Sequence, residues 1–265
     1  MTETAAGGVP RTLSREDGAT IAYHALPGKG PGVVFLTGFM SDMTGSKALA
    51  LEAHCRATGR AFVRFDYLGH GASSGRFEEG TIGRWADDAV TVLDRLTEGP
   101  QVLVGSSMGG WIMLLAALQR KARVAGLLGL APAPDFTEDL LWARFTPEQQ
   151  DTLMRDGALS VPNCYSDTPY TIARALVEEG RNHLLLGDTI DLHCPVRLIH
   201  GQRDEDVPWR TSLSLAEKLA TPDVEATLVK DAGHRLSEPR DLARLMDTLN
   251  GLLTHIETGA PTAAG

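Results

Sequence analysis

The chain has 265 residues and a mass of 28.4 kDa, with 43% hydrophobic and 22% charged residues, which is close to the globular average. These values predict one domain with room for an insertion. A net charge of −9 excludes a nucleic-acid partner, since phosphate binding needs clustered cations. The cysteines Cys55, Cys164 and Cys194 form no CxxC pair, so idle thiols in a reducing compartment are expected.

The N-terminal segment MTETAAGGVP lacks the basic and apolar regions of a secretory signal and the Arg-rich pattern of a transit peptide. The most apolar stretch, residues 108–118, contains two glycines and is too short to cross a bilayer. The sequence therefore predicts no integral membrane segment and a cytoplasmic location. The mitochondrial matrix is the alternative if a presequence has been removed.

The first half of the chain alternates strand and helix patterns. A hairpin is expected at RTLS and TIAYHAL around Asp17-Gly18, because that pair tolerates the positive φ of a tight turn. VVFLTG is a short apolar run between glycines, which is typical of a strand buried on both faces. Further strands are expected at RAFVRFDY, QVLVG and RVAGLLGL, and helices at residues 46–58, 81–96 and 108–119.

The pattern breaks between residues 131 and 194, where two helix-like runs, a Pro-rich loop and the helix-like TIARALVEEG follow one another. We interpret 131–194 as a helical cap inserted in a core of residues 9–130 and 195–256. The core resumes with strands CPVRLIHG and VEATLVK and helices at 211–220 and 238–256. Such alternation predicts an α/β fold with a mostly parallel sheet covered on both faces by helices. The tail, 257–265, is expected to be disordered.

The segment Gly105-Ser106-Ser107-Met108-Gly109 is a GxSxG motif between a predicted strand and a predicted helix. This is the context of a nucleophile elbow, in which the serine occupies a strained turn and small residues must flank it at two positions. Ser107 is the predicted nucleophile. Ser106 is the rival, but Val104 stands where its glycine would be needed.

A serine hydroxyl needs a histidine to take its proton and a carboxylate to orient that histidine. In this fold the order along the chain is serine, acid, histidine. Asp204 follows the strand VRLIHG, and His234 follows the last strand in KDAGHRLSE, so both occur in that order. Glu205 and Asp206 are weaker candidates for the acid because of the GxxDxxVP spacing.

The other histidines have no partner motif and are interpreted as structural; His200 lies in a strand and His70 in an early loop. Their spacing matches no metal-binding pattern, so no metal site is predicted. Ser-His-Asp chemistry also requires no cofactor.

The developing oxyanion needs two N–H donors. One is expected from Met108, the residue after the nucleophile, and the other from Phe39 in the loop after the first core strand. The side chains of Phe39 and Met40 either form a wall of the acyl pocket or belong only to the core.

Together these segments resemble the α/β-hydrolase superfamily over nearly the whole chain, including DYLGHGASSG at 66–75, whose Asp66 and His70 the resemblance makes structural or pocket-shaping. GSSMGGWIMLLAA and HGQRDEDVPWRTSLSLAEKL resemble a narrower group of mitochondrial acyl-protein thioesterases that also act as acyl-glucuronide esterases. The resemblance implies a serine esterase or thioesterase with triad Ser107, Asp204 and His234 and donors Phe39 and Met108. Because no presequence is evident, a bacterial relative is expected.

The expected substrate is a small-molecule or acylated-protein ester or thioester. Two alternatives remain: a C–C bond hydrolase of ring-cleavage dienones, because GxSMGG also resembles that branch, and a non-catalytic binding protein that keeps the fold. Within the cap, one set of apolar residues either lines an acyl groove or packs inward: Phe136, Leu140, Leu141, Trp142, Phe145, Leu153, Met154, Tyr165 and Tyr170. We expect four arginines of the cap to lie on the solvated surface rather than to contact an acidic leaving group: Arg144, Arg155, Arg174 and Arg181.

Overall fold

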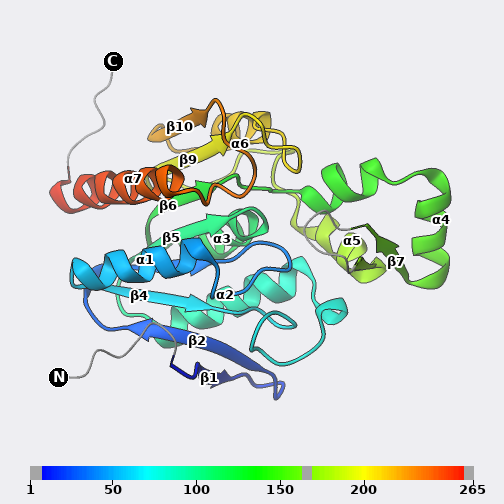
Figure 1. The fold of residues 1–265 in the computed structure, drawn as a ribbon, viewed down its shortest axis with the longest axis horizontal. Coiled ribbons are helices and arrows are strands. Elements are labelled where there is room, and N and C mark those ends of the chain that lie inside the picture. The colour runs from blue at the N-terminus through cyan, green and yellow to red at the C-terminus, as the bar shows by residue number, and fades with distance from the viewer. Residues whose placement is uncertain (1–7, 163–168, 260–265) are drawn as a thin grey trace.

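A computed structural model describes residues 8–162 and 169–259. Its centre is an eight-stranded sheet of order β1-β2-β4-β3-β5-β6-β9-β10 (Figure 1). Within this sheet, β1–β2 and β2–β4 pair antiparallel and every other neighbouring pair is parallel. The strands are β1 (Arg11–Ser14), β2 (Thr20–Leu26), β3 (Lys29–Leu36), β4 (Arg60–Phe65), β5 (Gln101–Ser106), β6 (Val124–Leu130), β9 (Val196–Gly201) and β10 (Val224–Val229).

Helices cover both faces of this sheet, as predicted. One face packs against α1 and α7, and the other against α2, α3 and α6. The central strands are buried on both faces because their side chains meet helices on each side, which explains their continuous apolar runs. These helices are α1 (Ser46–Ala57), α2 (Ile82–Leu96), α3 (Met108–Gln119), α6 (Arg210–Lys218) and α7 (Pro239–Thr258), with short η1 (Phe77–Glu79) and η2 (Lys121–Arg123) between them.

The segment between β6 and β9 projects beyond the sheet, to the right in Figure 1. It matches the predicted position of the cap; the division into core and cap stays a prediction. The cap is not wholly helical, because β7 and β8 pair antiparallel as a separate two-stranded sheet. TIARALVEEG is thus part strand and part helix. The cap elements are η3 (Thr137–Leu141), η4 (Trp142–Arg144), α4 (Pro147–Asp156), β7 (Ala158–Val161), β8 (Tyr170–Ala173), α5 (Arg174–Gly180) and η5 (Arg181–His183).

The prediction of a disordered tail from residue 257 is wrong at its start. Glu257 and Thr258 form the last turn of α7, which ends at the left-handed C-cap Gly259. An ion pair of 2.7 Å between Arg60 and Glu257 fixes this turn to β4. Residues 260–265 lie outside the described residues.

Two of the three cysteines lie in the described part of the chain. Cys55 and Cys194 are free thiols. Burial raises the pKa of Cys55 to about 12 and that of Cys194 to about 11, so both stay protonated and unreactive at neutral pH. Cys164 lies outside the described residues.

Candidate active site

Ser107 occupies a strained turn between β5 and α3. Its φ of 55° and ψ of −121° lie in a region that non-glycine residues rarely adopt. The turn is held by backbone bonds from the Ser107 N–H to Leu130 (2.9 Å) and from the Ala133 N–H to Ser107 (3.1 Å). It places the serine hydroxyl at the N-terminus of α3, at the carboxyl edge of the parallel strands.

The two glycines of the motif are required by space. A Cβ on Gly105 would lie 2.4 Å from the carbonyl oxygen of Gly109, and a Cβ on Gly109 would lie 2.2 Å from that of Leu36. Both neighbours are backbone atoms, which cannot turn aside as a flexible side chain could. Small residues are therefore required at these two positions, as expected from the sequence.

This crowding predicts a large stability loss for Gly109→Ala. We expect a cost of about 3 kcal/mol, because the new methyl group overlaps the backbone of β3. For a chain of this size that corresponds to a fall in melting temperature of roughly 6–12 °C, measured by circular dichroism. Gly251→Ala, in α7 with open space around it, should not lower the melting temperature, so an equal fall in both variants would refute the packing argument.

His234 connects Ser107 to Asp204. Its Nε2 lies 2.9 Å from the Ser107 Oγ, and its Nδ1 lies 2.7 Å from the Asp204 Oδ2. An Nδ1–H that donates to Asp204 leaves Nε2 as an acceptor for the serine proton. The three residues, separated along the chain by up to 127 positions, thus form one continuous hydrogen-bonded chain.

The Asp204 carboxylate is fully buried, and four N–H groups of the protein donate hydrogen bonds to it. Its Oδ1 accepts the N–H groups of Asp206 (3.0 Å) and Val207 (2.8 Å), and its Oδ2 accepts His234 and His200 (3.1 Å). Burial alone would raise the pKa of Asp204, but the bonds from His200 and His234 outweigh burial and hold the pKa well below its usual range. The carboxylate therefore stays charged wherever a histidine titrates.

His200 is a supporting residue that the sequence analysis treated only as a strand histidine. It is completely buried at the end of β9, where Nε2 lies 3.1 Å from both Asp204 and the Val207 carbonyl, and Nδ1 lies 2.7 Å from the Ser212 Oγ. A neutral ring with its proton on Nε2 satisfies all these contacts. Its position four residues before Asp204 was the available signal.

The loop that carries His234 is fixed on both sides. Before the histidine, the Arg203 N–H donates to the Ala232 carbonyl at 2.9 Å. After it, the Lys47 ammonium donates to the Arg235 carbonyl, which joins this loop to the start of α1. Burial lowers the pKa of Lys47 to about 8.

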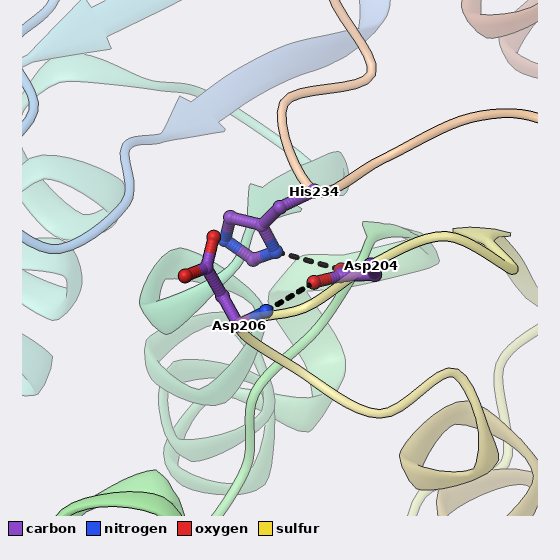
Figure 2. Close-up of side chains that lie close together, drawn as sticks. All are labelled: Asp204, Asp206 and His234. Atoms are coloured by element: carbon purple, nitrogen blue, oxygen red, sulfur yellow. Dashed lines mark hydrogen bonds and ion pairs between the residues drawn. The ribbon is translucent and has the colours of Figure 1, made fainter. Parts of the chain in front are cut away.

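Asp206 is the second acidic side chain beside His234. Figure 2 shows it turned toward the imidazole, while Asp204 contacts the ring from the other side. Within the described residues, Asp204, Asp206 and His234 are the group whose ligand atoms lie close enough for a metal ion, all within 4.8 Å of one another. Asp204 and His234, however, are already engaged with each other and with Ser107.

The loop after β3 runs beside the nucleophile. A Cβ on Gly38 would lie 3.3 Å from the carbonyl oxygen of Ser106 and 3.4 Å from the Cβ of Ser107, so the loop is in contact with the elbow. The loop is anchored by Asp66, whose carboxylate accepts the Met43 N–H at 2.7 Å and the Ala72 N–H at 2.9 Å. Phe39 in this loop and Met108, the first residue of α3, border the same cavity as Ser107. Their roles as oxyanion donors stay predictions.

His70 lies in the aromatic layer behind that loop. Its ring makes edge contacts with Tyr67, Phe77 and Trp85 at centroid distances of 5.1–5.6 Å. Burial lowers its pKa to about 4, so it stays neutral at physiological pH. This agrees with the structural role expected from the resemblance.

A cavity of about 500 Å³ extends from Ser107 beneath the cap. Phe39 and Met40 line it, so they are more than core residues. Four residues of the predicted acyl groove line this cavity: Phe136, Leu140, Leu141 and Tyr170. Four others of that set do not: Trp142, Phe145, Leu153 and Met154. Tyr165 lies outside the described residues. Of the residues outside the cavity, Phe145 and Leu153 are buried, Trp142 packs partly buried against the core, and Met154 is exposed.

The arginines of the cap are mostly paired at the surface. Ion pairs join Arg155 to Asp156, Arg174 to Glu178 and Arg181 to Glu138. Arg144 alone of the predicted four lines the cavity. No helix among the described residues has the length and apolar character needed to cross a membrane.

The fold and this site define an α/β hydrolase. The model of the alpha/beta hydrolase family matches residues 33–245, and the chain belongs to that family. Among curated proteins, it is 41% identical over 250 residues to the mouse protein named "Palmitoyl-protein thioesterase ABHD10, mitochondrial", covering 94% of this chain and 84% of that protein. The human protein of that name is 40% identical over 247 residues, with coverages of 93% and 80%.

Solved structures agree. Mouse alpha/beta hydrolase domain-containing protein 10 matches with a TM-score of 0.87 and 38% identity over 94% of this chain and all of that one. A putative hydrolase from Agrobacterium vitis S4 matches with a TM-score of 0.88 and 39% identity, covering 92% and 97%. The resemblance inferred from the sequence is confirmed at the level of family and of these relatives.

Proposed function

We propose that this chain is a serine hydrolase that cleaves carboxylic esters or thioesters, with Ser107 as nucleophile, His234 as general base and acid, and Asp204 as the orienting carboxylate. The continuous hydrogen-bonded chain from Asp204 through His234 to Ser107 carries this proposal. The names of the relatives, which are thioesterases, support it.

The reaction has two halves. In the first, Ser107 Oγ attacks the acyl carbon as His234 Nε2 takes the serine proton. The oxyanion that forms accepts hydrogen bonds from the backbone N–H groups of Phe39 and Met108. His234 then gives that proton to the departing oxygen or sulfur. In the second, His234 takes a proton from a water molecule that attacks the acyl carbon, and it then gives this proton to Ser107 Oγ as the ester bond breaks and the acid leaves.

The proposed substrate is an S-acylated protein or a related acyl ester. The cavity under the cap lies within the usual size of ligand sites and takes much of its lining from apolar side chains, which suits a hydrocarbon chain. The relatives' name specifies palmitoyl-protein substrates, and the same class is proposed here.

A chain-length series of paired p-nitrophenyl esters and S-acyl peptides tests the proposal. Each methylene buried in the cavity is worth about 0.8 kcal/mol, so kcat/KM should rise about fourfold per methylene until the cavity is filled. A maximum at two to four carbons without thioester turnover would contradict the thioesterase assignment. Turnover of a ring-cleavage dienone without turnover of any ester would overthrow the hydrolase class proposed.

The compartment and source are further proposals. The relatives are named as mitochondrial, so they lend no support to the predicted cytoplasmic location and accord with the matrix alternative. A bacterial source stays a prediction. Fractionation of cells expressing the full natural chain distinguishes the two compartments.

A further inference from the structure

The side chain of Phe39 lies at the centre of an aromatic cluster. Four rings contact it edge to face, with interplanar angles of 65–78°. The centroid distances are 4.9 Å to Phe77, 5.5 Å to Phe136, 5.9 Å to Tyr170 and 6.2 Å to Trp85. Edge-to-face pairs have a preferred geometry, so several of them together fix the position of a ring.

These rings come from two parts of the molecule. Phe77 lies on η1 and Trp85 on α2, both in the core, whereas Phe136 and Tyr170 belong to the segment between β6 and β9. Strand β8, which carries Tyr170, also packs against η1. The ring of Phe39 is therefore held between core and cap, and its backbone N–H is the one proposed to receive the oxyanion.

We propose that Tyr170 is a positioning residue: its ring, in edge-to-face contact with Phe39, helps to fix the Phe39 side chain and so keeps the Phe39 N–H directed at the oxyanion beside Ser107. The inference rests on the proposed function and extends it, because the cap then contributes to the chemical step as well as to acyl binding. Gly38, the residue before Phe39, lies directly beside the elbow, since a Cβ on it would be in van der Waals contact with Ser107 at 3.4 Å.

Tyr170 is a better residue than Phe136 for testing by substitution how the Phe39 ring is held. Phe136 is 7% exposed and also contacts Trp111 at 5.8 Å, so its removal disturbs the core. Tyr170 is half-buried at the end of a short strand. Removing an oxyanion donor costs about 100- to 1000-fold in kcat, and a partial displacement costs a fraction of that, about tenfold.

Tyr170 also lines the cavity, so the experiment must separate its effect on the position of Phe39 from its effect on acyl binding. A wall residue affects long acyl chains more than short ones, whereas a misplaced oxyanion donor lowers kcat equally for every chain length. We therefore expect Tyr170→Leu to lower kcat about tenfold on acetyl and on long-chain esters alike, with a smaller change in KM.

Two further variants complete the test. Tyr170→Phe keeps the ring and should restore kcat. Phe77→Leu removes a ring that touches Phe39 from the core side and does not line the cavity, so it should lower kcat on acetyl esters too. Phe77→Leu also tests the inference if Tyr170→Leu proves too unstable to assay.

Thr171→Ala is the matched control, since Thr171 neighbours Tyr170 on β8, carries no ring and does not line the cavity. It should keep wild-type kcat. An effect of Tyr170→Leu that grows with chain length and vanishes for acetyl esters would overturn the inference and leave the proposed function intact. Absence of Ser107-dependent turnover in the wild type would overturn both.

Discussion

Ser107→Ala should reduce kcat by about 10⁶-fold and abolish labelling by a fluorophosphonate probe. The hydroxyl that His234 contacts at 2.9 Å is the proposed attacking group, and alanine offers neither the oxygen nor the transferable proton. The backbone strain at this position remains in the variant, because alanine meets the same difficulty at a φ of 55°. Melting temperatures of the two proteins should therefore differ little, which separates lost chemistry from lost folding.

Ser106→Ala is the control for this prediction. Ser106 also lines the cavity, but it belongs to β5, while the His234 Nε2 contacts Ser107. We expect the Ser106 variant to be labelled by the probe and to hydrolyse esters. If it were silent while Ser107→Ala kept the label, the nucleophile assignment would be wrong.

The core was predictable because each of its signals is local. Glycine-bounded apolar runs marked the central strands, and residues 108–119 were expected as a helix that the structure gives with the same bounds. The elbow followed from the same local logic, since the need for small residues at 105 and 109 comes from backbone atoms within the fold's fixed turn.

The cap was less predictable because its structure depends on distant partners. The run from Tyr170 to Ala173 is too short for its strand-favouring residues to outweigh the helical pattern that follows, and it becomes strand by pairing with Ala158–Val161. His200 is comparable: its importance comes from where the end of β9 meets Asp204 and Ser212. Which cap side chains reach the cavity likewise depends on how η3 and β8 sit over Phe39.

The choice among three neighbouring acids shows what geometry adds to spacing. Asp204, Glu205 and Asp206 were all candidates, and only the first was favoured by the motif. In the structure Asp204 is buried and bonded to His234 Nδ1, Glu205 is exposed, and Asp206 donates its backbone N–H to Asp204. The assignment of Asp204 is therefore the one to test by substitution.

Asp204→Asn should lower kcat by about 10⁴-fold at neutral pH. An amide that turns its NH₂ toward His234 Nδ1 favours the tautomer with its proton on Nε2, which cannot accept the proton of Ser107. The same NH₂ would face the Nε2–H of His200, so the second bond to this oxygen would also be lost. Active-site titration with the fluorophosphonate probe, combined with steady-state rates, measures the loss per folded molecule.

Asp206→Asn is the matched control, because it removes a charge beside His234 but keeps the backbone N–H that Asp204 accepts. Its kcat should change less than about tenfold.

The low pKa of Asp204 gives a second test, the dependence of stability on pH. A depressed carboxyl pKa stabilises the fold above the pKa of the unfolded chain, and this contribution is lost as pH falls through the lower folded value. Asp204 therefore remains charged in mild acid, and thermal melts over a falling pH series should show this contribution lost in the wild type only below the usual pKa of an aspartate. Full activity of Asp204→Asn alongside a dead Asp206→Asn would move the acid of the triad to Asp206.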